Sequence, residues 1–373
     1  MALLARAREL EAAGRDVIHL EVGEPDFPTP EPVLAAGRRA LEQGQTRYTP
    51  AAGLPELRAG IAVWYRQCFG LELAPERILV TPGASGALQL LVAMLVDPGQ
   101  QVLVPDPGYP CNRHFLELVG GTPKPLALDP ARGFRPDADA LRAQWSHEVV
   151  AALLASPDNP TGNVLTPGEL GQLAAVARER RGALVVDEIY QGLVHEGEEH
   201  TVLAVEPDAL VINSFSKFFG MTGWRLGWLV APQALVPVLE RMAQNFFLAP
   251  PTPSQYAALA AFEPDTLEEL RRRQQVLDGR RRYLLEALEH AGLPVMGQPR
   301  GAFYVYVDVS VVTADSFSFC RDLLEREAVA LTPGVDFGHG HDPRRYLRIA
   351  YTCERERIEC AMERLQHFLE TTA

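Results

Sequence analysis

Short apolar runs alternate with longer helical patterns between residues 77 and 230, and this alternation constrains the fold of the chain most strongly. The strands expected from these runs are Arg77–Thr81, Gln101–Val104, Glu148–Ala155, Ala183–Asp187, Ala209–Asn213 and Arg225–Val230. Helical patterns such as Pro167–Arg181 separate them. Near-continuous apolar strands joined by helices are typical of a mostly parallel sheet with helices on both faces. We therefore predict an α/β fold with such a sheet in its large domain.

A second, smaller unit is expected beyond this sheet. The charged segment Thr266–Glu289 predicts a long helix, and its arginines alternate with acids, which favours a solvated face over a binding patch. The strand-like runs Gly301–Val309 and Tyr346–Ala350 then predict an α+β unit. We predict that residues 1–47 join this smaller unit, that residues 48–275 form the large domain, and that residues 276–373 form the small domain.

Composition excludes several classes of function for these 373 residues. A formal net charge of -13 argues against a nucleic-acid partner or an anionic membrane surface. No apolar stretch is long enough to span a membrane, and the start of the chain lacks a secretory apolar region. The five cysteines are scattered without metal-site spacing, which is typical of reduced thiols in the cytoplasm. The sequence His339–His341 lacks further ligands, so we expect a loop and no metal site.

Polar motifs directly follow several of the expected strands. In a parallel sheet, ligands bind at the carboxyl ends of the strands, which is where these motifs lie. Ser156–Gly162 comes directly after one strand, Asp187–Tyr190 closes the next, and Ser214 begins the run Ser214–Gly227. This placement predicts that the three motifs meet at one edge of the sheet. A purely structural protein would give no reason for so many costly polar groups to gather there.

Lys217 lies in the most informative of these motifs. A lysine amine is a nucleophile only when it is deprotonated, and apolar surroundings or nearby cations favour that form. Ser214, Ser216 and Arg225 supply the hydroxyls and the planar cation that suit a phosphate. A reactive amine beside a phosphate site is what a pyridoxal 5′-phosphate (PLP) enzyme requires. The alternative is a strand end whose lysine is merely solvated.

Five motifs in order resemble the class I/II aminotransferases of PLP fold type I over almost the full length. They are Tyr48–Pro55, Asn159–Gly162, Asp187–Tyr190, Ser214–Gly227 and Tyr346–Ile349. The resemblance implies a seven-stranded, mostly parallel sheet between helices and a smaller α+β domain. It also implies that amino acids and 2-oxo acids are the substrates. Thr222 departs from the pattern, because many members have proline there.

The resemblance implies catalytic roles for Lys217, Asp187 and Tyr190. Lys217 would hold the cofactor as an internal aldimine and would move the substrate proton as a base. Asp187 would pair with the pyridine nitrogen, and an unpaired carboxylate at the end of a buried strand would be costly. Tyr190 and Asn159 would donate hydrogen bonds to the 3′ oxygen of the ring. Asn159 also lies in the sequence Asn-Pro-Thr-Gly, which is typical of a turn. A structural role in the turn and a role in cofactor binding are compatible, because the turn would aim the amide.

The remaining cofactor contacts follow from the same resemblance. The phosphate site would comprise Ala84, Ser85, Ser214, Ser216 and Arg225. Ala84 and Ser85 follow a strand and open a helix, where backbone N–H groups bind anions, although such a turn is also an ordinary helix start. Tyr109 matches the aromatic that stacks on the pyridine ring, and Tyr48 matches the tyrosine that reaches the phosphate of a neighbouring subunit. A homodimer with shared active sites is therefore expected.

Arg348 and Gly23 are expected at the substrate, together with Asn159. Arg348 would hold the α-carboxylate in bidentate fashion, and the alternative partner is an internal Glu or Asp. Gly23 matches a glycine whose backbone approaches the same carboxylate, in a segment that would close over the site. Arg113 and Asn112 follow the Tyr109 loop and could recognise a side-chain carboxylate, but Arg113 could equally be a surface residue, so specificity for a dicarboxylate stays open.

These inferences predict a PLP-dependent aminotransferase with a ping-pong mechanism. The first alternative keeps the cofactor but gives a carbon–sulfur β-lyase or an aminocyclopropane carboxylate synthase-like enzyme, because the cofactor motifs do not determine the fate of the carbanion. The second alternative is a PLP-holding regulator, which would carry a DNA-binding domain. The chain offers neither the basic charge nor the N-terminal extension expected of one, and any N-terminal arm is expected to be about one helix.

Overall fold

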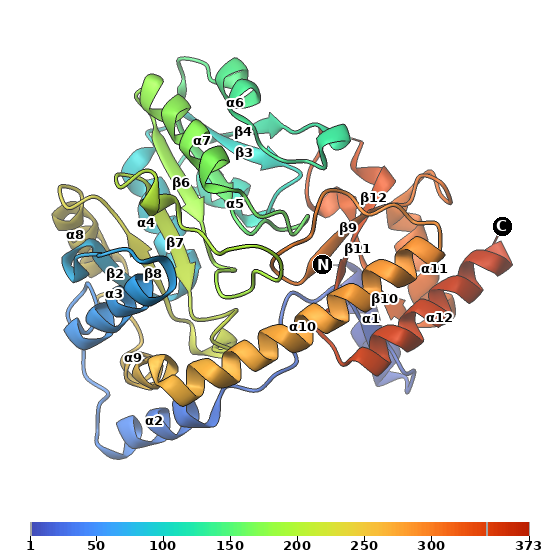
Figure 1. The fold of residues 1–373 in the computed structure, drawn as a ribbon, viewed down its shortest axis with the longest axis horizontal. Helices are drawn as coiled ribbons and strands as arrows, with labels where there is room; N and C mark the ends of the chain where they lie inside the picture. Colours follow the sequence, from blue (N-terminus) through green and yellow to red (C-terminus); the bar gives the residue numbers. More distant parts are fainter. Residues whose placement is uncertain (1, 341, 373) are drawn as a thin grey trace.

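The computed structural model describes residues 2–340 and 342–372, so that His341 lies outside the described residues. A seven-stranded sheet with strand order β2-β8-β7-β6-β5-β3-β4 forms the core of the large unit (Figure 1). Its strands are β2 (Ile78–Thr81), β3 (Gln101–Asp106), β4 (Thr122–Ala127), β5 (Val149–Ala155), β6 (Ala183–Asp187), β7 (Leu210–Ser214) and β8 (Gly227–Val230). Strand β8 is antiparallel to both neighbours and the other pairs are parallel, which confirms the predicted fold class.

Both faces of this sheet are buried, which explains why its strands are apolar throughout. Leu79 contacts one core and Val80 the other, because successive residues of a strand point to opposite faces. One face packs against helices α4 (Gly83–Leu95), α5 (Cys111–Leu118) and α8 (Val236–Phe246). The other packs against α3 (Pro55–Phe69), α6 (Ala138–Gln144) and α7 (Pro167–Glu179).

Strand β4 is the strand of this sheet that the apolar pattern did not indicate. Its sequence contains Pro123, Lys124 and Pro125, and half of its six residues are therefore unlike a buried strand. It pairs with β3 alone, at the edge of the sheet. Proline is tolerated at an edge because no further strand needs its missing N–H group.

The smaller unit holds a three-stranded sheet of β11 (Thr332–Pro333), β12 (Tyr346–Ala350) and β9 (Tyr304–Asp308). A separate parallel pair joins β1 (Ile18–His19) to β10 (Val329–Ala330). Helices α1 (Ala2–Ala12), α11 (Ser316–Glu327) and α12 (Arg355–Thr372) surround these strands (Figure 1). The start of the chain thus lies with the smaller unit.

Helix α2 (Glu31–Glu42) instead lies with the large unit, where it packs against α9 (Thr252–Leu259). A Cβ atom at Gly37 would lie 3.5 Å from Cβ of Ala257 in α9 and 2.5 Å from the ring of Trp224, which belongs to the turn before β8. Residues 31–42 therefore differ from the expectation that the whole segment 1–47 joins the smaller unit. The apolar stripe of a helix shows that it packs, but not on which unit.

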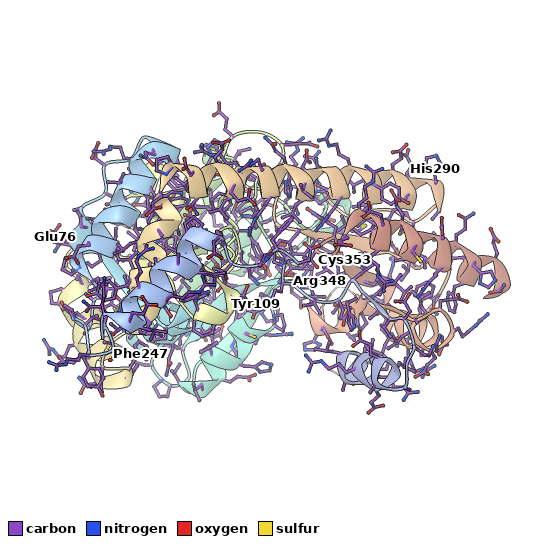
Figure 2. The ribbon with its side chains drawn as sticks, turned by 90° about the horizontal axis from the view of Figure 1, so that it is seen from below. Glu76, Tyr109, Phe247, His290, Arg348 and Cys353 are labelled. Carbon is purple, nitrogen blue, oxygen red and sulfur yellow. The ribbon has the colours of Figure 1, made fainter. Side chains whose placement is uncertain are left out.

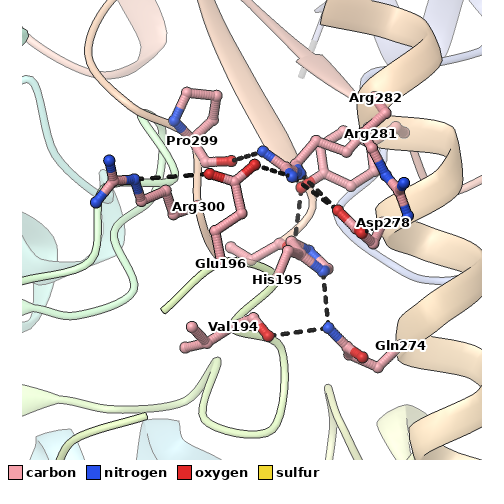
Figure 3. A network of polar contacts seen from close by, with 11 residues as sticks. Val194, His195, Glu196, Gln274, Asp278, Arg281, Arg282, Pro299 and Arg300 are labelled. Carbon is pink, nitrogen blue, oxygen red and sulfur yellow. Dashed lines mark hydrogen bonds and ion pairs between the residues drawn. The ribbon is translucent and has the colours of Figure 1, made fainter. Parts of the chain in front are cut away.

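Helix α10 (Pro264–His290) runs from the large unit to the smaller one as one continuous helix (Figure 1). The expected boundary between residues 275 and 276 falls inside it. A network of hydrogen bonds and ion pairs joins this helix to the loop after β6 (Figure 3). Arg281 forms an ion pair with Glu196, and Gln274 donates to the carbonyl of Val194 at 2.9 Å. The neighbouring His195 is half-buried, and its Nε2 lies 2.7 Å from the carbonyl oxygen of Ala302.

Within residues 2–340 and 342–372, no helix is long and apolar enough to cross a membrane. The same residues contain no group of three or more His, Cys, Asp or Glu side chains arranged to hold a metal ion.

Candidate active site

A cavity of about 370 Å³ lies at the carboxyl ends of β5, β6 and β7, where the two units meet. Every site residue expected from the sequence lines it, except Tyr48. Figure 2 shows Tyr109 and Arg348 in the middle of the molecule, between the units. The loops after three parallel strands therefore bring distant motifs together, as the rule for parallel sheets predicts.

One end of the cavity is suited to an anion. Helix α4 starts at Gly83 directly after β2, so the N–H groups of its first turn have no partner within the helix. Gly83 has φ +71°, and a Cβ atom there would lie 2.7 Å from Nη2 of Arg225. Ser214 Oγ donates to Ser216 Oγ at 2.9 Å. Among the described residues no acidic side chain pairs with Arg225, whose Nη1 donates to the carbonyl of Thr222 at 3.0 Å.

Lys217 lines the cavity from the turn after β7. Its Nζ donates to the carbonyl of Gly23 at 2.7 Å and lies 5.7 Å from the ring centroid of Phe303. The chain contains a single other lysine, Lys124. That side chain donates to Ser146 Oγ from the edge strand β4 and does not line the cavity. Among the lysine amines, Lys217 alone is placed for chemistry in this cavity.

Asp187 ends β6 with its carboxylate at the cavity wall. Its Oδ1 accepts a hydrogen bond from the N–H of Ile189 at 3.0 Å. Burial raises the pKa of Asp187 to about 7, and the cation on Lys217 opposes that shift. A carboxylate held this way is stabilised by a cationic N–H group that enters the cavity.

Arg348 approaches the cavity from β12 of the smaller unit and is buried, with 7% of its surface exposed. Its Nη1 donates to Asn159 Oδ1 at 2.9 Å, and its Nη2 donates to the carbonyl of Glu21 at 2.7 Å. Its Nε is buried without a partner. No carboxylate of the described residues pairs with it, so the alternative of an internal acid finds no support. A buried, uncompensated guanidinium favours a carboxylate ligand.

Tyr304 is a cavity residue that the sequence analysis did not identify. Its hydroxyl oxygen lies 3.1 Å from the hydroxyl oxygen of Tyr190, and the centroid of its ring lies 4.2 Å from the guanidinium carbon of Arg348. Burial raises the pKa of Tyr190 well above its usual value. The strand around Tyr304 was expected, but Phe303-Tyr304-Val305-Tyr306 is apolar on both faces, so its sequence does not show which aromatic faces a ligand.

Tyr48, which was expected at the site of a partner, and Arg113, which was left open, lie away from the cavity. Tyr48 has 81% of its surface exposed. Arg113, considered above for a dicarboxylate, donates through Nη2 to the backbone carbonyl of Asp336 at 3.5 Å and does not line the cavity. Its neighbour Asn112 does line it.

Comparison with known proteins matches residues 15–365 to the family model for aminotransferase class I and II. The chain is 36% identical to (5-formylfuran-3-yl)methyl phosphate transaminase of Methanocaldococcus jannaschii, over 99% of this chain and 96% of the relative. It is 37% identical to valine–pyruvate aminotransferase of Mycobacterium tuberculosis, over 97% and 94%. A crystal structure of an aminotransferase from Mycobacterium tuberculosis superposes with a TM-score of 0.96 at 36% identity and covers 100% of this chain and 96% of that one.

The chain therefore belongs to the aminotransferase class I and II family. It is a PLP-dependent aminotransferase, and none of these comparisons favours the lyase alternative. The residues of the cavity fit this cofactor. The anion site at the start of α4 suits its phosphate, the Lys217 amine suits its aldehyde, and the buried Asp187 carboxylate suits its ring nitrogen.

Proposed function

We propose that the chain moves an amino group from an amino acid to a 2-oxo acid in two half-reactions, with Lys217 as the amine that bonds the cofactor and as the base. One observation carries this proposal. Lys217, Asp187 and Arg348 line the same cavity, so an amine, a buried carboxylate and an uncompensated guanidinium face one small volume.

The cofactor, when bound, supplies an aldehyde for the amine of the substrate and a ring that accepts electrons from the α-carbon. Asp187 would hold a proton on the ring nitrogen through its carboxylate. Tyr190 would donate a hydrogen bond from its hydroxyl group to the 3′ oxygen. The contact with the hydroxyl group of Tyr304 would fix the direction of that hydrogen bond. Asn159 would offer its amide Nδ2 to the same oxygen, because its Oδ1 accepts from Arg348.

The phosphate would be held by the backbone N–H groups of Ala84 and Ser85, the hydroxyls of Ser214 and Ser216, and Arg225. Tyr109 would cover one face of the ring. These contacts fix the cofactor, so that Lys217 Nζ needs to move only a short distance to take or return the proton of the α-carbon.

Arg348 would bind the α-carboxylate of the substrate, and the backbone of Gly23 would lie against it. Substrate binding would also release Lys217 from the carbonyl of Gly23, since the amine has to face the α-carbon. The two contacts thus link the arrival of a substrate to the freeing of the base.

Absorbance spectroscopy of the holoenzyme tests this proposal. Single amino acids are added without an acceptor, and a 2-oxo acid is added afterwards. The proposal predicts that the cofactor band shifts with an amino acid and returns with the oxo acid. A band that persists while ammonia and pyruvate accumulate from a sulfur amino acid would instead support the β-lyase.

We further propose a homodimer in which Tyr48 completes the phosphate site of the partner, since its exposed side chain does not line the cavity of its own chain. Mixed dimers of Lys217→Ala and Tyr48→Ala chains test this. Each heterodimer would contain one intact site, so activity should rise above that of either variant. Lys217→Ala mixed with Tyr109→Ala is the control, because Tyr109 lines its own cavity and no intact site forms. Absence of recovery in the first mixture would contradict the shared site.

A cytoplasmic location is also proposed, because all five cysteines are free thiols. Cell fractionation checks it, and the proposal fails if the protein is recovered outside the cytoplasmic fraction.

A further inference from the structure

Tyr304 lies on the same face of the three-stranded sheet as Arg348. Strand β9 pairs with β12 so that Tyr306 lies opposite Arg348, and Tyr304 is two residues along on the same face. The ring centroid of Tyr304 is 4.2 Å from the guanidinium carbon of Arg348. Tyr304 lines the catalytic cavity, whereas Tyr306 stacks on Tyr346 and does not line it. Of the two tyrosines on β9, Tyr304 is therefore the one placed to act on a bound cofactor.

The hydroxyl group of Tyr304 meets the hydroxyl group of Tyr190 from the large unit. The two oxygen atoms are 3.1 Å apart, and the rings are nearly perpendicular, with centroids 5.7 Å apart. Tyr304 is 2% exposed and Tyr190 is 5% exposed, so bulk water does not readily replace either partner. The close fit extends to Gly23, where a Cβ atom would lie 2.1 Å from the hydroxyl oxygen of Tyr304. Packing therefore holds the hydroxyl of Tyr304 against that of Tyr190.

The chemistry of the two hydroxyl groups determines which of them donates. Each has one proton and can also accept hydrogen bonds through its oxygen. Burial raises the pKa of Tyr190 well above its usual value, so this hydroxyl keeps its proton at neutral pH. When Tyr190 directs that proton to the 3′ oxygen of the cofactor, as proposed above, its oxygen is left to accept. The proton between the two tyrosines then belongs to Tyr304.

We infer that Tyr304 is a positioning residue that donates a hydrogen bond to the hydroxyl oxygen of Tyr190 and so strengthens the hydrogen bond from Tyr190 to the cofactor. A hydroxyl group that accepts a hydrogen bond becomes a better donor, because hydrogen bonds in a chain polarise one another. Tyr304 thus acts on the cofactor through Tyr190, while its ring packs on Arg348. This inference rests on the proposed function, because it takes Tyr190 as the donor to the 3′ oxygen.

The charge on the 3′ oxygen gives this chain of hydrogen bonds a measurable consequence. A hydrogen-bond donor favours the anionic form of an oxygen. The 3′ oxygen depends on Tyr190 most when the nitrogen that joins Lys217 to the cofactor has lost its proton, because a protonated nitrogen shares its proton with that oxygen. A weaker donor at Tyr190 therefore raises the pH at which the nitrogen loses its proton, and the absorbance of the cofactor reports that pH.

A pH titration of the cofactor absorbance in the holoenzyme, without substrate, tests the inference. Tyr304→Phe keeps the ring and removes the hydroxyl. It should raise the midpoint by about 0.3–0.7 pH unit, because one hydrogen bond strengthens its neighbour by a fraction of a full bond. Tyr190→Phe removes the donor itself and should raise the midpoint further. Tyr306→Phe is the matched control, since it removes a buried hydroxyl of the same strand that does not line the cavity, and it should leave the midpoint unchanged.

The double variant Tyr190→Phe/Tyr304→Phe completes the cycle. It removes both hydroxyls and leaves neither without its partner, so it tests the inference even if Tyr304→Phe alone fails to fold. Its midpoint should equal that of Tyr190→Phe, because Tyr304 acts through Tyr190. A midpoint that differs between these two variants would overturn the inference, since Tyr304 would then act by another route.

An unmoved midpoint in folded Tyr304→Phe also overturns the inference. In that case the Tyr190→Phe result separates it from the proposed function. A midpoint that moves in Tyr190→Phe alone leaves Tyr190 as the donor to the 3′ oxygen. A midpoint that moves in neither variant contradicts that assignment as well.

Discussion

Nη1 of Arg348 donates a hydrogen bond to Oδ1 of Asn159 at 2.9 Å, across the boundary between the two units. Arg348 belongs to β12 of the smaller unit, and Asn159 belongs to the loop after β5 of the large sheet. The residue proposed to hold the substrate and a residue proposed to contact the cofactor therefore orient one another. A carboxylate bound at Arg348 would therefore change the hydrogen bonding and orientation of the Asn159 side chain directly.

Replacing Arg348 with Ala should raise KM for every amino donor while the cofactor stays bound. The loss of charge-assisted hydrogen bonds to the α-carboxylate corresponds to about 2–3 kcal/mol, or roughly 30- to 150-fold in kcat/KM. Steady-state kinetics measure it, and the cofactor absorbance reports occupancy. Arg113→Ala is the control and should change neither value. A normal KM in the Arg348 variant would show that another group holds the carboxylate.

Asp187→Asn should lower kcat on the order of 100-fold, because the amide cannot balance a protonated ring nitrogen. The adjacent Glu188 supplies a matched control. It is also buried, but it accepts from the N–H of Val202. Burial raises the pKa of Glu188 to about 8, so it is largely neutral at pH 7 and Glu188→Gln resembles it. Equal losses of turnover in the two variants would argue that only buried packing matters at Asp187.

Gly23→Ala should inactivate the enzyme for a steric reason. A Cβ atom at residue 23 would lie 2.1 Å from the hydroxyl oxygen of Tyr304 and 3.2 Å from the ring carbon that bears it. Tyr304→Phe removes that oxygen, so the double variant should recover part of the activity lost by Gly23→Ala. Comparison of kcat/KM for the single and double variants measures the coupling. Strictly additive losses would mean that the two residues do not act through this contact.

Stability should decrease at mildly acidic pH because of His195. Burial lowers the pKa of this imidazole to about 4, whereas the unfolded chain has the ordinary value near 6.5. Between these values the unfolded state binds a proton that the folded state does not, so the free energy of unfolding falls as pH drops from 6.5 towards 4. The total amounts to at most about 3 kcal/mol.

Urea unfolding at several pH values measures this dependence. His195→Gln keeps a donor for the carbonyl of Ala302 but does not titrate, so it should show a shallower pH slope than the wild type. Identical slopes would assign the acid sensitivity to other groups.

The sequence predicts the large sheet well because each of its strands except β4 carries the apolar signal of a strand buried on both faces. It also predicts the polar motifs of the cavity, since each comes directly after such a strand. The place of Asp187 at the end of β6 is an example, because strand order and polarity alone bring it to the ligand edge.

The remaining features depend on tertiary packing, which local sequence does not encode. Tyr304 lines the active-site cavity only because β9 lies beside segments distant in the chain. The position of α2 on α9 likewise depends on a long-range contact, that of Gly37 with Ala257. In each case the residue type is compatible with several environments, and the fold selects one.

The covalent attachment of the cofactor to Lys217 is the central claim, and reduction of the holoenzyme with borohydride followed by peptide mass mapping tests it most directly. With two lysines in the chain, Lys124 serves as an internal control. We expect the mass of the reduced cofactor on the peptide that contains Lys217, and none on the peptide that contains Lys124. Cofactor found on Lys124 or on the terminal amine, with Lys217 unmodified, would contradict the account.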